Sequence, residues 1–316
     1  MGDQLGLNLI SSLGSEYIRI SESVPVGYSG LKMGVNASVL NYRLITQDFI
    51  ALSANGTSTS LGLETNYPFI KSNSSLLNLA FNVDHKHFVN NSQGAVVSDY
   101  ANSPLTLGLS GYNSDSILGG GYGVGSLNIS SGGINLNNSP AVYQSNDANT
   151  TQVSGRYTKA RYFLSREQDL LSGLTFYTAV SGQWANKNLD SSEKFYLGGV
   201  NGVRAYPTNE AGGALGELAT TELRARVLGR YTIAGFYDFG QILINPSNNF
   251  SAASSLNSYA LKGAGLSLGY QSTTGASLKA VIAKRIGKNP NPTSSGNDQD
   301  GSLQSTRIWL NANLPF

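Results

Sequence analysis

The sequence predicts an all-β fold, an antiparallel transmembrane β-barrel in which residues 1–316 form one domain. Three observations predict it. Polar and apolar residues alternate with a period of two along most of the chain, as in strands with one apolar face. No stretch approaches the roughly 20 consecutive apolar residues that a membrane helix needs. Charged residues make up only 13 % of the chain. It contains 37 glycines and 17 tyrosines, a composition that favours strands and turns over helices.

The last segment of the chain shows the alternation most clearly. One face carries Ile308, Leu310, Ala312, Leu314 and Phe316, and the other carries Arg307, Trp309, Asn311 and Asn313. An apolar row that ends on an aromatic residue at the terminus resembles the strand that the outer-membrane assembly machinery recognises. We therefore interpret Phe316 as a membrane-insertion signal. The alternative is the half-buried last strand of a soluble sandwich.

Alternation and turn residues together predict about fourteen strands. They lie near 3–13, 15–24, 30–42, 52–66, 74–89, 95–111, 119–130, 150–165, 172–186, 216–228, 231–243, 258–272, 275–286 and 305–316. Short turns alternate with long polar connections at 133–149, 187–215, 244–257 and 287–304. This asymmetry is typical of outer-membrane barrels and predicts extracellular long loops and a periplasmic C-terminus. The first and last long connections, rich in Asn, Ser and Gly, are interpreted as mobile loops.

One predicted strand carries three charges on a single face, namely Glu222, Arg224 and Arg226. Three charges are costly in a dry core, but they are tolerated where the face lines a water-filled lumen. The pattern therefore favours a wide barrel with these residues on its inner wall over a sandwich.

Composition and isolated motifs exclude several other functions. The absence of Cys excludes disulfides, thiolate metal sites and a cysteine nucleophile. A net charge of +2 without a basic run predicts no nucleic-acid partner. Gly265–Gly269 matches G-x-S-x-G, but Ser267 lies inside an alternating strand with no helix after it. His85 and His87 share a strand face without a carboxylate cluster, and Gly119–Gly125 lacks the Lys-Ser/Thr of a phosphate loop. We predict no enzyme activity, metal or cofactor.

Two further motifs stand in a fixed order. Lys194–Pro207 reads KFYLGGVNGVRAYP within a long predicted loop, and Gly235–Gly240 reads GFYDFG in a later strand. Together with the terminal Phe, they resemble the haemolysin secretion/activation translocators of two-partner secretion, within the superfamily of polypeptide-transporting β-barrels. The matching loop positions are Leu197, Gly198, Gly199, Val203, Arg204, Ala205, Tyr206 and Pro207, and the matching strand positions are Phe236, Asp238 and Gly240.

The resemblance implies that the long loop folds into the barrel lumen, where Arg204 meets Asp238 on the inner wall. An Arg fork suits bidentate pairing with a carboxylate. Alternation places Asp238 on the same face as Phe236 and Gly240. The alternative is a surface Arg in an ordinary loop and an unrelated Asp near a strand end.

The resemblance also implies a function and a larger protein. Family members translocate a large secreted exoprotein of adhesin or haemolysin type, in extended form, across the outer membrane. Outer-membrane lipid, lipopolysaccharide and the barrel-assembly machinery are further expected partners. Members have 16 strands after periplasmic POTRA domains. Counting back from Phe316 therefore predicts that the first two strands, the POTRA domains and the signal peptide are missing from this sequence.

Three alternative functions remain open at this point. A barrel-assembly factor of the same superfamily would carry a related loop, but that loop prefers Arg-Gly over Arg-Ala-Tyr-Pro. A passive diffusion porin would have no fold-back loop with Val-Arg-Ala-Tyr, and a different loop would build its constriction. A soluble carbohydrate-binding module would need a dry core and a solvent-exposed charged face.

Overall fold

The computed structural model describes residues 2–45 and 50–315, and antiparallel strands dominate it. The sheet strands are β1 (Gln4–Ser11), β2 (Ser15–Val26), β3 (Leu31–Arg43), β4 (Asn55–Lys71), β5 (Ser75–Ser92), β6 (Ala95–Asn102), β7 (Leu105–Asp115), β8 (Gly121–Asn135), β9 (Gly155–Leu171), β10 (Leu174–Ala185), β13 (Leu215–Val227), β14 (Tyr231–Leu243), β15 (Ser258–Gln271), β16 (Ser277–Arg285) and β17 (Thr306–Asn313). The strands pair in chain order except at β6 and β7, which each pair with β5 and β8, and every ladder is antiparallel, which confirms the predicted fold class.

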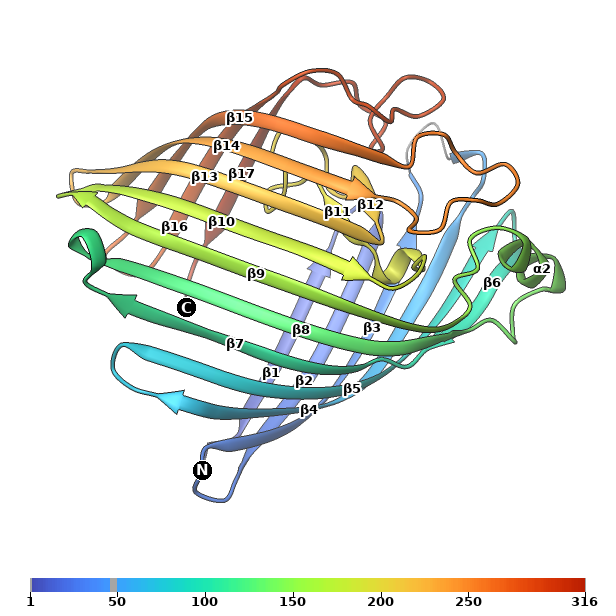
Figure 1. Cartoon of the computed structure of the whole chain (residues 1–316), viewed down its shortest axis with the longest axis horizontal. Coiled ribbons are helices and arrows are strands. Elements are labelled where there is room, and N and C mark those ends of the chain that lie inside the picture. The colour runs from blue at the N-terminus through green and yellow to red at the C-terminus, as the bar shows by residue number, and fades with distance from the viewer. Residues whose placement is uncertain (1, 46–49, 316) are drawn as a thin grey trace.

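The sheet curls so that its two ends, β1 and β17, both lie on the far side of the molecule (Figure 1). β1 pairs with β2 and β17 pairs with β16, and no ladder joins β1 to β17 within the described residues. The sheet therefore has two free edges, whose N–H and C=O groups can accept a further strand.

The predicted strand at 95–111 is wrong in one respect, because Ser103 and Pro104 divide it into β6 and β7. Proline has no N–H to donate to a ladder, so it interrupts pairing within a sheet. The carbonyl of Pro104 instead accepts a hydrogen bond from the Asp84 amide at 3.0 Å. β6 pairs with Lys86–Ser92 of β5, and β7 pairs with Ser75–Val83 of the same strand.

The alternation places apolar side chains on the outside of the sheet. On β14 to β17 the outward residues include Ile233, Leu266, Leu268, Ile282 and Ile308, each about half exposed or more. The inward residues between them are polar, small or covered by loops. An apolar exterior around a polar interior is the pattern of a barrel that faces lipid. No helix within the described residues is long and apolar enough to cross a membrane.

Short turns gather at one end of the barrel and long connections at the other (Figure 1). The interpretation of 133–149 as a mobile loop is wrong, because β8 extends to Asn135 and α2 occupies Ala141–Asn149. Polar residues obscured this helix, whose end is held by Asp147 accepting from the Val153 and Ser154 amides. The 287–304 connection also makes specific contacts, which bear on the site below.

The connection between β10 and β13 contains two short elements, the 3-10 helix η2 (Ser191–Glu193) and a hairpin of β11 (Phe195–Leu197) and β12 (Ala211–Gly213). The hairpin lies inside the curl of the sheet, against β13 and β14 (Figure 1). Its tip and the facing wall form the largest buried apolar cluster. The principal core of this barrel is therefore built by a loop, which residue alternation alone does not predict.

Candidate functional site

Residues 198–210 form a tight loop at the tip of the β11–β12 hairpin. Gly198 and Gly199 have φ values of +89° and +90°, a backbone region that only glycine adopts readily. The Gly199 amide donates to the Tyr206 carbonyl at 3.0 Å, which closes the loop on itself. A Cβ at Gly202 would come within 2.5 Å of the Gly198 carbonyl oxygen. The glycines of the motif thus allow a compact tip that projects Arg204.

Arg204 projects from the loop tip onto Asp238 of β14. Its Nε donates to Asp238 Oδ2 at 2.9 Å and its Nη2 donates to Asp238 Oδ1 at 2.7 Å. The backbone amide of Arg204 donates to the same carboxylate at 3.1 Å. Arg204 is 4 % exposed and Asp238 is fully buried. Two buried charges with three mutual hydrogen bonds form a strong, directional contact between loop and wall.

The ion pair extends along the inner face of β13. Arg204 Nη1 donates to Glu222 Oε1 at 2.7 Å, and Arg224 Nε donates to Glu222 Oε2 at 2.7 Å. Arg224 also pairs with Glu167 of β9. A cavity of about 320 Å³, lined in part by Arg204, Glu222 and Arg224, lies beside this row. Charges thus alternate in sign from the loop tip to the open lumen, which limits the cost of burying them.

Apolar and aromatic contacts fix the same loop. The Arg204 guanidinium carbon lies 3.4 Å from the centre of the Phe236 ring, within the range of a cation–π contact. A Cβ at Gly240 would come within 2.7 Å of the Leu197 side chain and 3.1 Å of the Val203 side chain, so a larger residue there would push both side chains away from the wall. The loop therefore fits the wall by shape as well as by charge.

A second anchor holds the segment that precedes the motif. Glu193, 3 % exposed, pairs with Lys159 at 2.6 Å and with Lys86 at 3.1 Å. Asn102 Nδ2 donates to the same carboxylate at 2.7 Å. These partners come from β5, β6 and β9, on the wall away from Asp238. The loop is thus tied to two parts of the barrel wall.

A third set of contacts joins the loop to the 287–304 connection and the last two strands. The Arg285 guanidinium carbon lies 4.3 Å from the centre of the Tyr206 ring, and Arg285 pairs with buried Asp298 at 2.5 Å. Trp309 Nε1 donates to the Arg204 carbonyl at 2.8 Å. The interpretation of 287–304 as a mobile loop omitted these contacts, because they depend on partners distant in sequence.

Glu210 follows the loop tip and is the carboxyl group most affected by burial there. Burial raises the pKa of Glu210 from its ordinary 4.5 to about 7, although the Gln299 amide and the Asn289 side chain donate to it. The nearby charges are Asp298, which also raises the pKa, and Arg285, which lowers it. Between pH 4.5 and 7, Glu210 thus binds a proton when the loop is docked and loses it when the loop is released.

The contribution of Glu210 to docking is therefore expected to be greatest below pH 4.5 and to be lost as pH rises through 7. Spin labels on cysteines introduced at Thr208 and Leu266 would report the loop-to-wall distance, because the chain has no native cysteine. Replacing Glu210 by Gln should remove most of the pH dependence between pH 5 and 8. A distance distribution that responds equally to pH in both proteins would contradict this assignment.

The structure does not bring all the sequence-predicted residues together. Arg226 shares the inner face of β13 but is exposed near the turn, and it makes no ion pair among the described residues. Pro207 is buried at the loop tip, and Phe316 lies outside the described residues. His85 and His87 have separate partners, Ser103 and Asp99.

Glu193, Glu210 and Asp298 were not predicted from the sequence. Alternation would have placed Lys86 and Lys159 on inner strand faces, as it did for Glu222, but it would not have identified their shared partner.

Comparison with known proteins identifies the family. The family model described as haemolysin secretion/activation protein ShlB/FhaC/HecB matches residues 4–270. The chain belongs to this family. The heme/hemopexin transporter protein HuxB of Haemophilus influenzae strain 86-028NP is 28 % identical over 295 residues, covering 91 % of this chain and 51 % of HuxB. The chain thus spans about half the length of the curated relatives it matches.

Solved structures agree on the fold. CdiB from Acinetobacter baumannii has a TM-score of 0.66 at 18 % identity, covering 97 % of this chain and 52 % of that one. CdiB from Escherichia coli has a TM-score of 0.68 at 15 % identity, with coverages of 95 % and 53 %. BamA from Haemophilus ducreyi has a TM-score of 0.64 at 16 % identity, with coverages of 99 % and 64 %. The family and this fold locate the barrel in the bacterial outer membrane.

Proposed function

We propose that this chain is the membrane-embedded translocator of a two-partner secretion system, which passes a large exoprotein of adhesin or haemolysin type to the cell surface. Membership of the haemolysin secretion/activation family supports this function. The observation that carries it is the loop at 198–210, fastened inside the lumen by Arg204 on Asp238. A passive porin would have its constriction built by a different loop, without the Val203–Tyr206 motif.

The mechanism follows from where the loop lies. An extended polypeptide needs a continuous lumen, and the docked loop occupies part of it. The Arg204 side chain borders a cavity of about 320 Å³, so water can reach the charges when the loop moves. Rehydration offsets part of the energy lost when the ion pair separates, so release and redocking are feasible without a chemical energy source. No covalent bond is made or broken in this mechanism.

The proposal includes an orientation and a set of surroundings. The long connections and α2 face the cell exterior, and the short turns and C-terminus face the periplasm, as in barrels with short periplasmic turns. Phospholipid and lipopolysaccharide surround the apolar exterior, and the outer-membrane assembly machinery inserts the barrel. Residues 1–316 act as one barrel domain.

Replacing Arg204 by Ala in the full-length protein tests the function. We expect secretion of the partner to fall several-fold at matched barrel abundance, because the loop loses the contacts that fix its position. Conductance across a planar bilayer should rise, because the released loop no longer constricts the lumen. Arg204→Lys should not restore secretion, because an ammonium group cannot form the paired hydrogen bonds of a guanidinium.

Arg226→Ala is the matched control, because Arg226 lies on the same wall outside the ion-pair network. Unchanged secretion by Arg204→Ala would refute the role of the loop. A general fall in other outer-membrane barrels, with secretion unaffected, would favour a barrel-assembly factor instead.

A further inference from the structure

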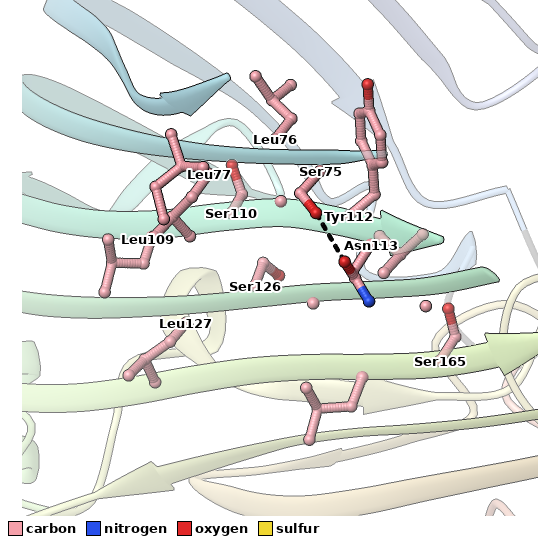
Figure 2. Close-up of a pocket in the computed structure, with 16 residues that line it drawn as sticks. Ser75, Leu76, Leu77, Leu109, Ser110, Tyr112, Asn113, Ser126, Leu127 and Ser165 are labelled. Atoms are coloured by element: carbon pink, nitrogen blue, oxygen red, sulfur yellow. Dashed lines mark hydrogen bonds between the residues drawn. The ribbon is translucent and has the colours of Figure 1, made fainter. Parts of the chain in front are cut away.

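A groove of about 540 Å³ lies on the outer surface of the barrel, across β5, β7, β8 and β9. Its floor is formed by Gly111, Gly123 and Gly125, and neighbouring leucines such as Leu109 and Leu127 form its walls. Figure 2 shows these leucines on one side of the view and Asn113 on the other. Glycines on the outside of a barrel remove side chains that would otherwise meet lipid, so the groove is a built depression in the lipid-facing surface.

The strand register places a gradient of polarity along the groove. From the middle of the barrel toward the short turns, the outward pairs of β7 and β8 are Leu109 with Leu127, Gly111 with Gly125, Asn113 with Gly123, and Asp115 with Gly121. The groove thus begins apolar, continues over bare backbone, and ends among polar side chains. An acyl chain that continues into a polar headgroup has the same order of chemistry.

Just beyond the polar end of the groove, at the next outward positions of β7 and β9, lie the charged residues Asp115 and Arg166. Arg166 Nη1 and Nη2 donate to the two Asp115 carboxylate oxygens at 2.8 and 2.9 Å. A Cβ at Gly121 would overlap the Arg166 guanidinium, so this glycine lets Arg166 lie along the surface. Nearby, the Ser75 hydroxyl donates to Asn113 Oδ1 at 2.6 Å, which orients the Asn113 side chain (Figure 2).

We propose that this groove binds one phospholipid with an ammonium-bearing headgroup, from the leaflet next to the short turns. One acyl chain lies over Gly123 and Gly125. The phosphate meets the Arg166 guanidinium, and the ammonium group meets the Asp115 carboxylate. The paired charges of the site match the two opposite charges of a zwitterionic headgroup, whereas a purely anionic lipid would leave Asp115 facing negative charge.

The choice of leaflet rests on the orientation given under the proposed function, in which the short turns are periplasmic and the adjacent leaflet is phospholipid. The binding site itself depends only on the barrel lying in a membrane. Its test therefore reads lipid retention and does not read secretion.

The test is retention of lipid by the full-length protein, reconstituted with equal amounts of phosphatidylethanolamine and phosphatidylglycerol and then extracted in mild detergent for native mass spectrometry. We expect the wild-type protein to retain one phosphatidylethanolamine. Gly123→Leu fills the groove, where the nearest atoms to a new Cβ are 3.7 Å away, and should lower occupancy by about tenfold. Gly235→Leu is the control, since this outward glycine of β14 has similar room, with Leu266 at 3.8 Å, outside the groove.

A separate substitution, at Asp115, tests which lipid headgroup the site prefers. Asp115→Asn should retain a lipid but lose the preference for phosphatidylethanolamine over phosphatidylglycerol. Equal retention by wild type and Gly123→Leu would overturn the site, as would wild-type protein that retains phosphatidylglycerol in preference. Normal secretion by Gly123→Leu is expected, so a failed secretion test of Arg204 would leave this result unaffected.

Discussion

Replacing Asp238 by Ala is expected to release the lumenal loop. The change leaves the Arg204 guanidinium buried with only Glu222 as a charged partner, and it removes three of the hydrogen bonds from Arg204. Breaking a buried pair by removing one partner costs about 3–5 kcal/mol. A cost of that size favours the released loop, in which Arg204 regains water. Spin labels at Thr208 and Leu266 should show a broad, longer distance distribution in place of a narrow one.

Asp169→Ala is the matched control, because Asp169 is an exposed aspartate at the end of β9, near a short turn. It should leave the distance distribution unchanged. A narrow, wild-type distribution in Asp238→Ala would show that shape complementarity alone holds the loop, through contacts such as Leu197 and Val203 against Gly240.

Replacing Glu193 by Ala is expected to have the second largest effect, on a different part of the loop. The change leaves Lys86 and Lys159 facing each other without their shared carboxylate, and Lys159 is only 8 % exposed. Loss of one partner from this buried group should cost about 3–5 kcal/mol locally. Amide hydrogen exchange should speed up across 190–197, while protection of β14 stays high, because the Arg204 anchor is intact.

The control for this change is Glu217→Ala, which removes an exposed glutamate on the outer face of β13. Its amide protection across 190–197 should equal that of the wild type. If Glu193→Ala opens the Arg204 anchor as well, the two anchors act as one cooperative unit and the loop has a single release step.

Strand patterns determined most of the barrel, for a local physical reason. A strand with lipid on one side and water on the other must alternate, so Ile308 and Leu310 on one face of β17 and Trp309 on the other are visible in sequence. The division at Pro104 and the helix α2 were missed. The division at Pro104 depends on which part of β5 pairs with β6 and which part pairs with β7. The helix α2 has a polar sequence without a distinct apolar face.

The candidate site divides in the same way. The glycines and Arg204 of the loop, and Asp238 of β14, could be named in advance, because two short motifs resemble those of the family and alternation places Asp238 on an inner strand face. Tertiary structure alone decided that Glu222 shares the Arg204 charge, that Glu193 joins β5, β6 and β9, and that Trp309 holds the loop carbonyl. These contacts join residues up to 107 positions apart, and partner choice across a lumen depends on how the sheet curls, which no local pattern contains.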